Sequence, residues 1–176
     1  MDKIYTIGHS TRSIEELLSL LKVYDIELLI DIRTIPKSRH CPQFNQEPLK
    51  RALKRNGIGY RHRKDLGGFR HPLKESANTG WINASFRGYA DYMQTPAFER
   101  ALEKLEKQAL KKRVALMCAE AVPWRCHRSL VADILTVKKW KVFHIQSKKT
   151  AKRHCQTPFL RMKRGKPVYQ APPSEA

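Results

Sequence analysis

Short apolar runs alternate with amphipathic segments along most of this chain, and this alternation limits the possible folds more than any other feature. The apolar runs are rich in strand-forming residues and cover residues 4–7, 28–32, 58–62, 114–117 and 141–145. The intervening segments carry apolar residues at helical spacing and cover residues 14–22, 46–56, 86–93, 97–110 and 129–137. The sequence therefore predicts an α/β fold, a three-layer sandwich with a mostly parallel sheet of about five strands and helices on both faces.

Helix-start signals precede three of the amphipathic segments. Ser13 precedes Glu16 by three residues, which is the spacing of a capping box. Thr95 stands before Pro96, which suits the first helical position. Asn45 is a candidate cap for the helix that follows it. These signals support the predicted helix boundaries.

The length of 176 residues fits a single α/β domain, which we expect over residues 1–160. Residues 161–176 are basic, contain prolines and offer few core residues, so they predict an extended or flexible tail. No stretch approaches the ~20 apolar residues of a membrane span, and no membrane partner is expected. The start of the chain does not read as a secretory signal, and the four cysteines are unevenly spaced. The expected location is therefore the cytoplasm.

The charge of the chain is strongly positive, with 35 Lys and Arg against 16 Asp and Glu and a net charge of +19. Residues 138–176 hold eleven of these basic residues and one acidic residue. Such an excess favours a polyanionic partner, with nucleic acid first and another phosphorylated ligand second. The alternative is that the charge serves solubility alone.

Polar and reactive side chains follow the predicted strands, at the edge where ligands bind in open α/β sheets. The candidate catalytic residues are His9, Asp31, Cys118 and His127. The candidate phosphate- or anion-binding residues are Ser10, Thr11, Arg33, Arg39, Arg125 and Arg128. His9 and His127 are candidates for proton transfer, although His9 also suits local packing at the helix entry. Asp31 lies in an apolar run, so its carboxylate needs a partner such as Arg33.

Cys118 ends a predicted strand and is followed by a loop, two arginines and a helix start. Arginine and a helix N-terminus both stabilise a thiolate, and the same surroundings hold an oxyanion or phosphate. Cysteine-dependent phosphatases and sulfur transferases share this plan, but six residues here separate Cys118 from Arg125, so the match is loose. The alternative is that Cys118 is a buried core thiol.

Two further patterns leave weaker alternatives open. Cys126-His127 and His154-Cys155 form two ligand pairs that a fold can bring together as a zinc site, but their spacing is not that of a known zinc motif. We therefore expect no metal and no other cofactor. The long loop 63–84 and its flanks mix aromatic and basic residues, which suits either base stacking or closure of the core.

Several motifs together resemble the DUF488 family, a domain of unknown function. They are IGHST (7–11), DIRTIPKSR (31–39), PQFN (42–45), LGG (66–68), CAE (118–120) and PWRCHR (123–128). The resemblance spans roughly residues 3–160 and implies an α/β fold with a polar site built from these motifs, but it supplies no reaction. The DIR stretch (31–33) also resembles a strand motif of rhodanese-like domains, whereas the loop after Cys118 departs from theirs.

Three functions remain as hypotheses. The first is an enzyme that acts on nucleic acid or on another phosphorylated ligand, with arginines that hold phosphate. The second is a cysteine-dependent sulfur or phosphoryl transferase for a small substrate. The third is a non-catalytic nucleic-acid-binding module, whose affinity falls steeply with salt.

Overall fold

A six-stranded sheet with the order β3-β2-β4-β1-β5-β6 forms the centre of the computed structural model, which describes residues 2–172. The strands are β1 (Lys3–Gly8), β2 (Leu28–Asp31), β3 (Gly59–His62), β4 (Val114–Cys118), β5 (Lys141–Ile145) and β6 (Ala151–Arg153). The first five are parallel to one another, and β6 is antiparallel to β5. The mostly parallel sheet predicted from the sequence is confirmed, with β6 as an additional edge strand.

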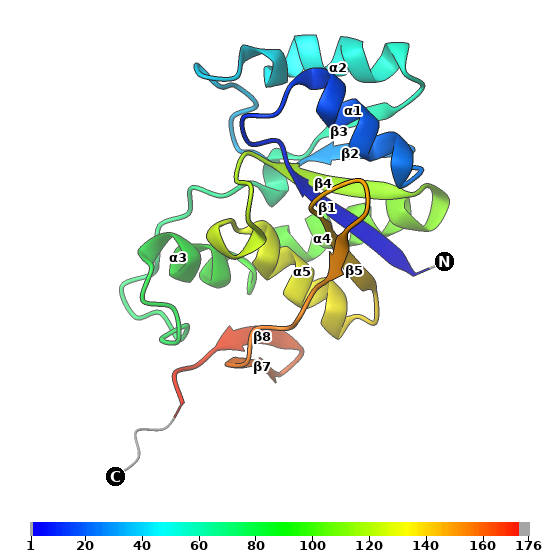
Figure 1. Ribbon diagram of the computed structural model, residues 1–176. Helices are drawn as coiled ribbons and strands as arrows, with labels where there is room; N and C mark the ends of the chain where they lie inside the picture. Colours follow the sequence, from blue (N-terminus) through cyan, green and yellow to red (C-terminus); the bar gives the residue numbers. More distant parts are fainter. Residues whose placement is uncertain (1, 173–176) are drawn as a thin grey trace.

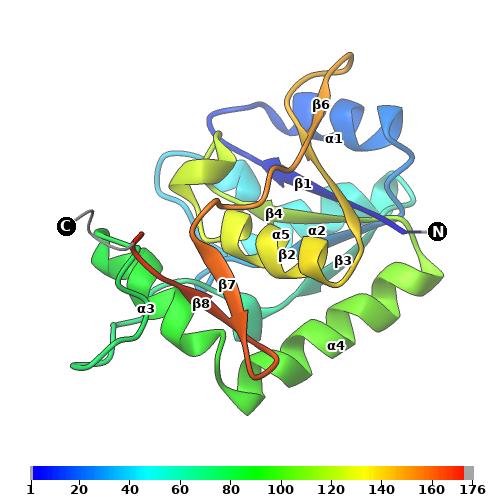
Figure 2. The same ribbon diagram turned by 90° about the horizontal axis from the view of Figure 1, so that it is seen from below.

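Helices cover both faces of the sheet (Figures 1 and 2). One face carries α1 (Ile14–Val23) and α2 (Gln46–Arg55), and the other carries α3 (Ala84–Tyr92), α4 (Pro96–Lys111) and α5 (Arg128–Val137). The three-layer α/β sandwich is therefore confirmed. Within residues 2–172, no helix has the length and apolar character that crossing a bilayer requires.

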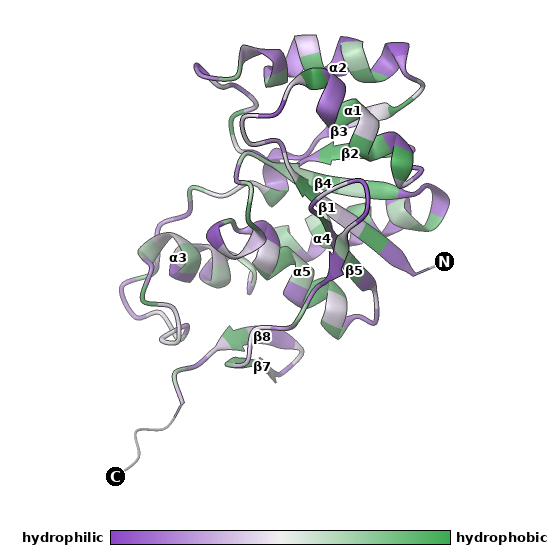
Figure 3. Cartoon of the chain, viewed as in Figure 1, coloured by the Kyte–Doolittle hydropathy of each residue, from purple (hydrophilic) through white to green (hydrophobic). Residues whose placement is uncertain are grey.

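The strands separate two apolar cores, because successive side chains of a strand point to opposite faces. Figure 3 shows the apolar colouring on β2 and β4, between helices whose outer turns are more polar. In β4, Leu116 and Cys118 join the core under α4 and α5, whereas Ala115 and Met117 join the core under α1 and α2. Cys118 therefore faces the α5 side of the sheet.

Local capping explains where the helices begin. The Ser13 side chain accepts a hydrogen bond from the Glu16 N–H at 3.1 Å, and Thr95 caps α4 with Pro96 at its first position. Asn45 precedes α2, but its side chain makes no capping bond. Its Oδ1 accepts instead from the Ser38 N–H at 2.7 Å, which fixes the loop after β2.

The chain after residue 160 differs from the expected extended tail. Residues 160–169 form a hairpin of β7 (Leu160–Lys163) and β8 (Lys166–Tyr169), seen beside α4 and α5 in Figure 2. Tyr169 is buried, and its hydroxyl donates to Asp133 Oδ2 at 2.8 Å while its N–H donates to Asn78 Oδ1 at 2.9 Å. Both partners are distant in sequence, so the local composition did not reveal this docking. The last part of the expected tail, residues 173–176, lies outside the described residues.

Candidate functional site

A cavity of about 470 Å³ opens at the carboxyl ends of β2 and β4. Its aromatic and aliphatic wall includes Ile35, Phe69, Phe86 and Tyr89. Its charged and reactive lining is made by Arg33, Lys37, Cys118, Glu120, Arg125, Cys126 and His127, so it holds three basic residues against one carboxylate. The cavity thus lies at the sheet edge where the sequence places the candidate residues, although not all of those residues line it.

Cys118 is the last residue of β4 and is only 2% exposed. The loop after it passes through a short 3-10 turn, Pro123–Arg125, and returns to the same edge at Cys126, just before α5. Cys126 lines the same cavity, beside Cys118. Two thiols from the two ends of one loop therefore meet at the floor of the cavity.

Arg128, in the first turn of α5, is 1% exposed and reaches toward this pair of thiols. Its Nη1 donates to Cys118 Sγ at 3.0 Å and to the Glu120 carbonyl at 2.9 Å, and its Nη2 donates to the Ala121 carbonyl at 3.0 Å. Among the described residues, no carboxylate pairs with this guanidinium and its Nε has no hydrogen-bond partner. A buried cation without a carboxylate favours an anionic Cys118 sulfur beside it.

The two thiols differ in acidity. Burial acts to raise the pKa of Cys118, but the neighbouring Cys126 thiol and the charge of Arg128 outweigh it and hold that pKa below its ordinary value. Burial and the neighbouring Cys118 raise the pKa of Cys126 well above its ordinary value. Cys118 is therefore the more acidic thiol of the pair and ionises before Cys126.

His127 lines the cavity next to Cys126. Its Nε2 donates to the Ile32 carbonyl at 3.1 Å, so its Nδ1 carries the lone pair, 3.6 Å from Cys126 Sγ. Burial lowers the pKa of His127 to about 4, so the ring is neutral near pH 7. A side chain at Gly68 would place its Cβ 3.2 Å from that Nδ1, so glycine at this position leaves room for the ring.

Asp31 and Arg33 form a second group at the carboxyl end of β2. Arg33 donates to Asp31 through its Nε at 2.9 Å and its Nη2 at 2.7 Å, and the Tyr60 hydroxyl donates to the same carboxylate at 2.7 Å. The Arg33 Nη2 also donates to the Phe44 carbonyl at 2.8 Å. Asp31 does not line the cavity, so its contacts orient Arg33, which does. The partnership of Asp31 with Arg33 that the sequence suggests is present in the structure.

His9 is held within the protein rather than at the cavity surface. It is 3% exposed, its ring stacks on Phe44 with centroids 4.5 Å apart, and its Nδ1 donates to the Ser10 carbonyl at 2.8 Å. The other nitrogen, Nε2, faces Arg33 Nη1 at 3.4 Å. Burial lowers the pKa of His9. This geometry matches the packing alternative, since both ring nitrogens are engaged by the protein.

Two of the six candidate anion-binding residues line the cavity, and the other four do not. Arg33 and Arg125 line the cavity, whereas Arg128 lies behind Cys118. Thr11 and Arg39 are exposed away from the cavity lining, and the N–H of Ser10 donates to the Ala119 carbonyl at 2.9 Å. These last three residues are therefore not brought together with the cavity.

Sequence reasoning missed Lys37 and the pairing of Cys126 with Cys118. The signal for the pairing was present, because a loop between a strand end and a helix start returns to the same sheet edge. Nothing local to Lys37 distinguishes it from the other surface lysines of this basic chain.

The alternative zinc site is not assembled. Cys126 and His127 line the cavity described above, whereas His154 and Cys155 line a separate cavity of about 260 Å³. His154 Nε2 instead contacts Asp133 Oδ1 at 2.7 Å. In residues 2–172, no group of three or more His, Cys, Asp or Glu side chains is arranged to hold a metal ion.

Comparison with known proteins identifies the family of this chain. Neither the curated proteins nor the solved structures contain a match. One family model, described as "Domain of unknown function DUF488", matches residues 13–135, a span that includes β2, β4, the loop with both thiols and most of α5. The chain therefore belongs to the DUF488 family.

Proposed function

We propose that this protein is an enzyme that binds a phosphorylated ligand in the cavity and attacks it with the thiolate of Cys118. One observation supports this proposal above all others: the buried guanidinium of Arg128 lies 3.0 Å from Cys118 Sγ, and no carboxylate of the described residues pairs with it. A thiolate is the nucleophilic form of cysteine. Arg128 stabilises that form at the floor of a cavity large enough for a small ligand.

The basic lining gives the cavity its preference for phosphate. Arg33 is fixed by Asp31 and by the Phe44 carbonyl, so its guanidinium is presented in one orientation. Arg125 and Lys37 are exposed side chains of the same lining. Asp31, the Phe44 carbonyl and His9 engage four of the five N–H groups of Arg33, so it offers phosphate one preoriented Nη1 donor. The exposed guanidinium of Arg125 is the one that can bind phosphate through paired hydrogen bonds.

The reaction class that this arrangement supports is phosphoryl transfer. The Cys118 sulfur attacks phosphorus, an S–P bond forms and the bond from phosphorus to the departing oxygen breaks. The departing oxygen takes a proton from water, and a second water hydrolyses the S–P bond. His9 and His127 do not serve as the acid in this proposal, because their ring N–H groups donate to backbone carbonyls.

The proposal is tested with nitrophenyl phosphate as the probe. The wild-type chain is expected to release nitrophenolate and to form a phosphocysteine adduct detectable by mass spectrometry. Cys118→Ser is expected to do neither, and Arg33→Ala to weaken binding of the probe. Cys155→Ser, an exposed thiol outside the cavity, is the matched control and should behave as the wild type. Equal nitrophenolate release by the wild type and Cys118→Ser, or none by the wild type, would contradict the proposal.

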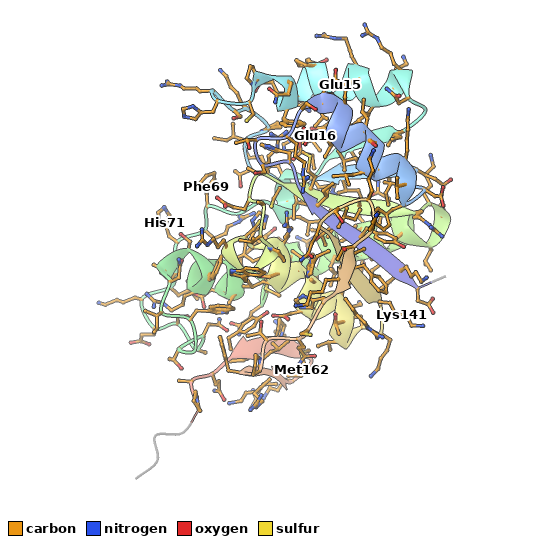
Figure 4. All side chains as sticks on the ribbon, viewed as in Figure 1. Glu15, Glu16, Phe69, His71, Lys141 and Met162 are labelled. Atoms are coloured by element: carbon orange, nitrogen blue, oxygen red, sulfur yellow. The ribbon has the colours of Figure 1, made fainter. Side chains whose placement is uncertain are left out.

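A second candidate function, non-catalytic binding of nucleic acid, is favoured by one feature of the cavity rim. Phe69 is 82% exposed, its backbone φ is 54°, and it lies at the edge of the molecule in Figure 4. It shares the cavity lining with Arg125 and Lys37. An exposed ring next to cations is typical of surfaces that stack bases of single strands. A labelled single-stranded oligonucleotide whose binding weakens with salt and with Phe69→Ala would support this function, and salt-insensitive binding would exclude it.

A further inference from the structure

Cys126 forms no bond to the ligand in the proposed phosphoryl transfer, yet the structure places it beside the reactive thiol. Both sulfurs line one cavity, and one arginine contacts both of them. The Arg128 side chain donates to Cys118 Sγ at 3.0 Å, and the Arg128 N–H donates to Cys126 Sγ at 3.5 Å. Among the described residues, the Nε of this arginine has no hydrogen-bond partner and no carboxylate neutralises its guanidinium.

We propose that Cys118 and Cys126 form a two-cysteine redox centre that reduces a hydroperoxide and closes into a disulfide. This inference shares the Cys118 thiolate with the proposed function, and it does not depend on a phosphorylated ligand. The pairing is specific in the structure, because the other two cysteines lie elsewhere. Cys41 belongs to the core under α1 and α2, and Cys155 is exposed beside the second cavity.

The first step oxidises Cys118. Its thiolate attacks the terminal oxygen of the hydroperoxide, an S–O bond forms and the O–O bond breaks. The sulfur becomes a sulfenic acid, and the departing alkoxide, or hydroxide when hydrogen peroxide is the oxidant, takes a proton from water. Arg33 and Arg125 in the lining provide positive charge where the departing anion develops.

The second step closes the disulfide. The Cys126 sulfur attacks Cys118 Sγ, an S–S bond forms and the S–O bond breaks. The Cys126 proton goes to the departing hydroxide, which leaves as water. The Nδ1 of His127 lies 3.6 Å from Cys126 Sγ, so His127 is a positioning residue for this thiol.

Oxidation with stoichiometric hydrogen peroxide, followed by peptide mapping without reductant, tests this inference. The wild-type chain should yield one disulfide, between Cys118 and Cys126. Cys126→Ser should stop at the sulfenic acid, which dimedone traps on Cys118. His127→Ala should slow disulfide closure, because it removes the contact with Cys126 Sγ at 3.6 Å. Cys155→Ser is the matched control and should form the same disulfide as the wild type.

Two results overturn the inference: a wild-type chain that forms no disulfide between Cys118 and Cys126, or a Cys126→Ser variant in which dimedone labels no Cys118. Because serine is close to cysteine in size and shape, we expect Cys126→Ser to keep the fold, and circular dichroism checks this. The outcome is separable from that of the proposed function. Disulfide formation without nitrophenolate release refutes only the phosphoryl transfer, and nitrophenolate release without disulfide formation refutes only the redox centre.

Discussion

The docking of the C-terminal hairpin onto α5 predicts a measurable loss of stability for Tyr169→Phe. The Tyr169 hydroxyl donates to Asp133 Oδ2 at 2.8 Å in the protein interior, and both residues are buried. Phenylalanine keeps the ring contacts with Trp81 and Phe159, whose centroids lie 5.4 and 6.0 Å from that of Tyr169. The substitution therefore removes one hydrogen bond and little packing.

The size of the loss follows from the state of Asp133 after the change. Its Oδ1 keeps two contacts, with His154 Nε2 at 2.7 Å and the Thr157 N–H at 2.9 Å, while Oδ2 loses the tyrosine. A hydrogen bond to a charged group contributes about 1.5–3 kcal/mol, so the free energy of unfolding should fall by about that amount. For a chain of this size the melting temperature should fall by about 3–12 °C.

Urea denaturation followed by circular dichroism measures this free energy. Tyr24→Phe is the control, because its hydroxyl donates to the Ser147 carbonyl at the surface and its loss should change stability by less than about 0.5 kcal/mol. A Tyr169→Phe variant within about 0.5 kcal/mol of the wild type, a change no larger than that of a surface substitution, would refute the reasoning, since the hairpin would then not be anchored through Asp133.

Two further predictions concern pH and the close approach at Gly8. Burial lowers the pKa of His127 to about 4 and that of His144 to about 3. As the pH falls below ~6.5, these two histidines therefore bind protons in the unfolded chain but not in the folded chain. The contribution of these two histidines to the free energy of unfolding should be constant above that pH and should fall below it by about 1.4 kcal/mol per pH unit for each histidine. His144→Asn should have a shallower slope below that pH, and an equal slope would contradict this assignment. Gly8→Ala should destabilise the fold by on the order of 4 kcal/mol, because the new Cβ would lie 1.7 Å from the Glu120 carbonyl oxygen. Gly59→Ala meets the flexible end of a leucine side chain at 3.1 Å and should cost far less in thermal melts; equal losses would contradict the clash.

The helices and the parallel strands were predictable because their periodicity is a local property. The 14–22 and 97–110 segments became α1 and α4 with small shifts at their ends, and the caps at Ser13 and Thr95 form as expected. The strands β6, β7 and β8 are three or four residues long, and their pairing depends on partners elsewhere in the fold. Composition alone could not reveal them.

The candidate site was predictable in its location but only in part in its geometry. The strand–loop–helix segment after Cys118 correctly placed a thiol near arginines, and Asp31 does hold Arg33. Which face of the sheet each side chain occupies depends on strand register, and this separates Cys118 from Asp31. The interior position of His9, stacked on Phe44, likewise depends on contacts 35 positions apart in sequence.

The central claim is that Cys118 is a thiolate held by Arg128, and its most direct measurement is the ultraviolet absorption of that thiolate as a function of pH. The difference between the wild type and Cys118→Ser isolates this sulfur, because burial and its neighbour raise the pKa of Cys126 well above the ordinary value. We predict that the difference spectrum shows the thiolate band already below the ordinary thiol pKa of ~8.5. A band that appears only at or above that pH would contradict the account.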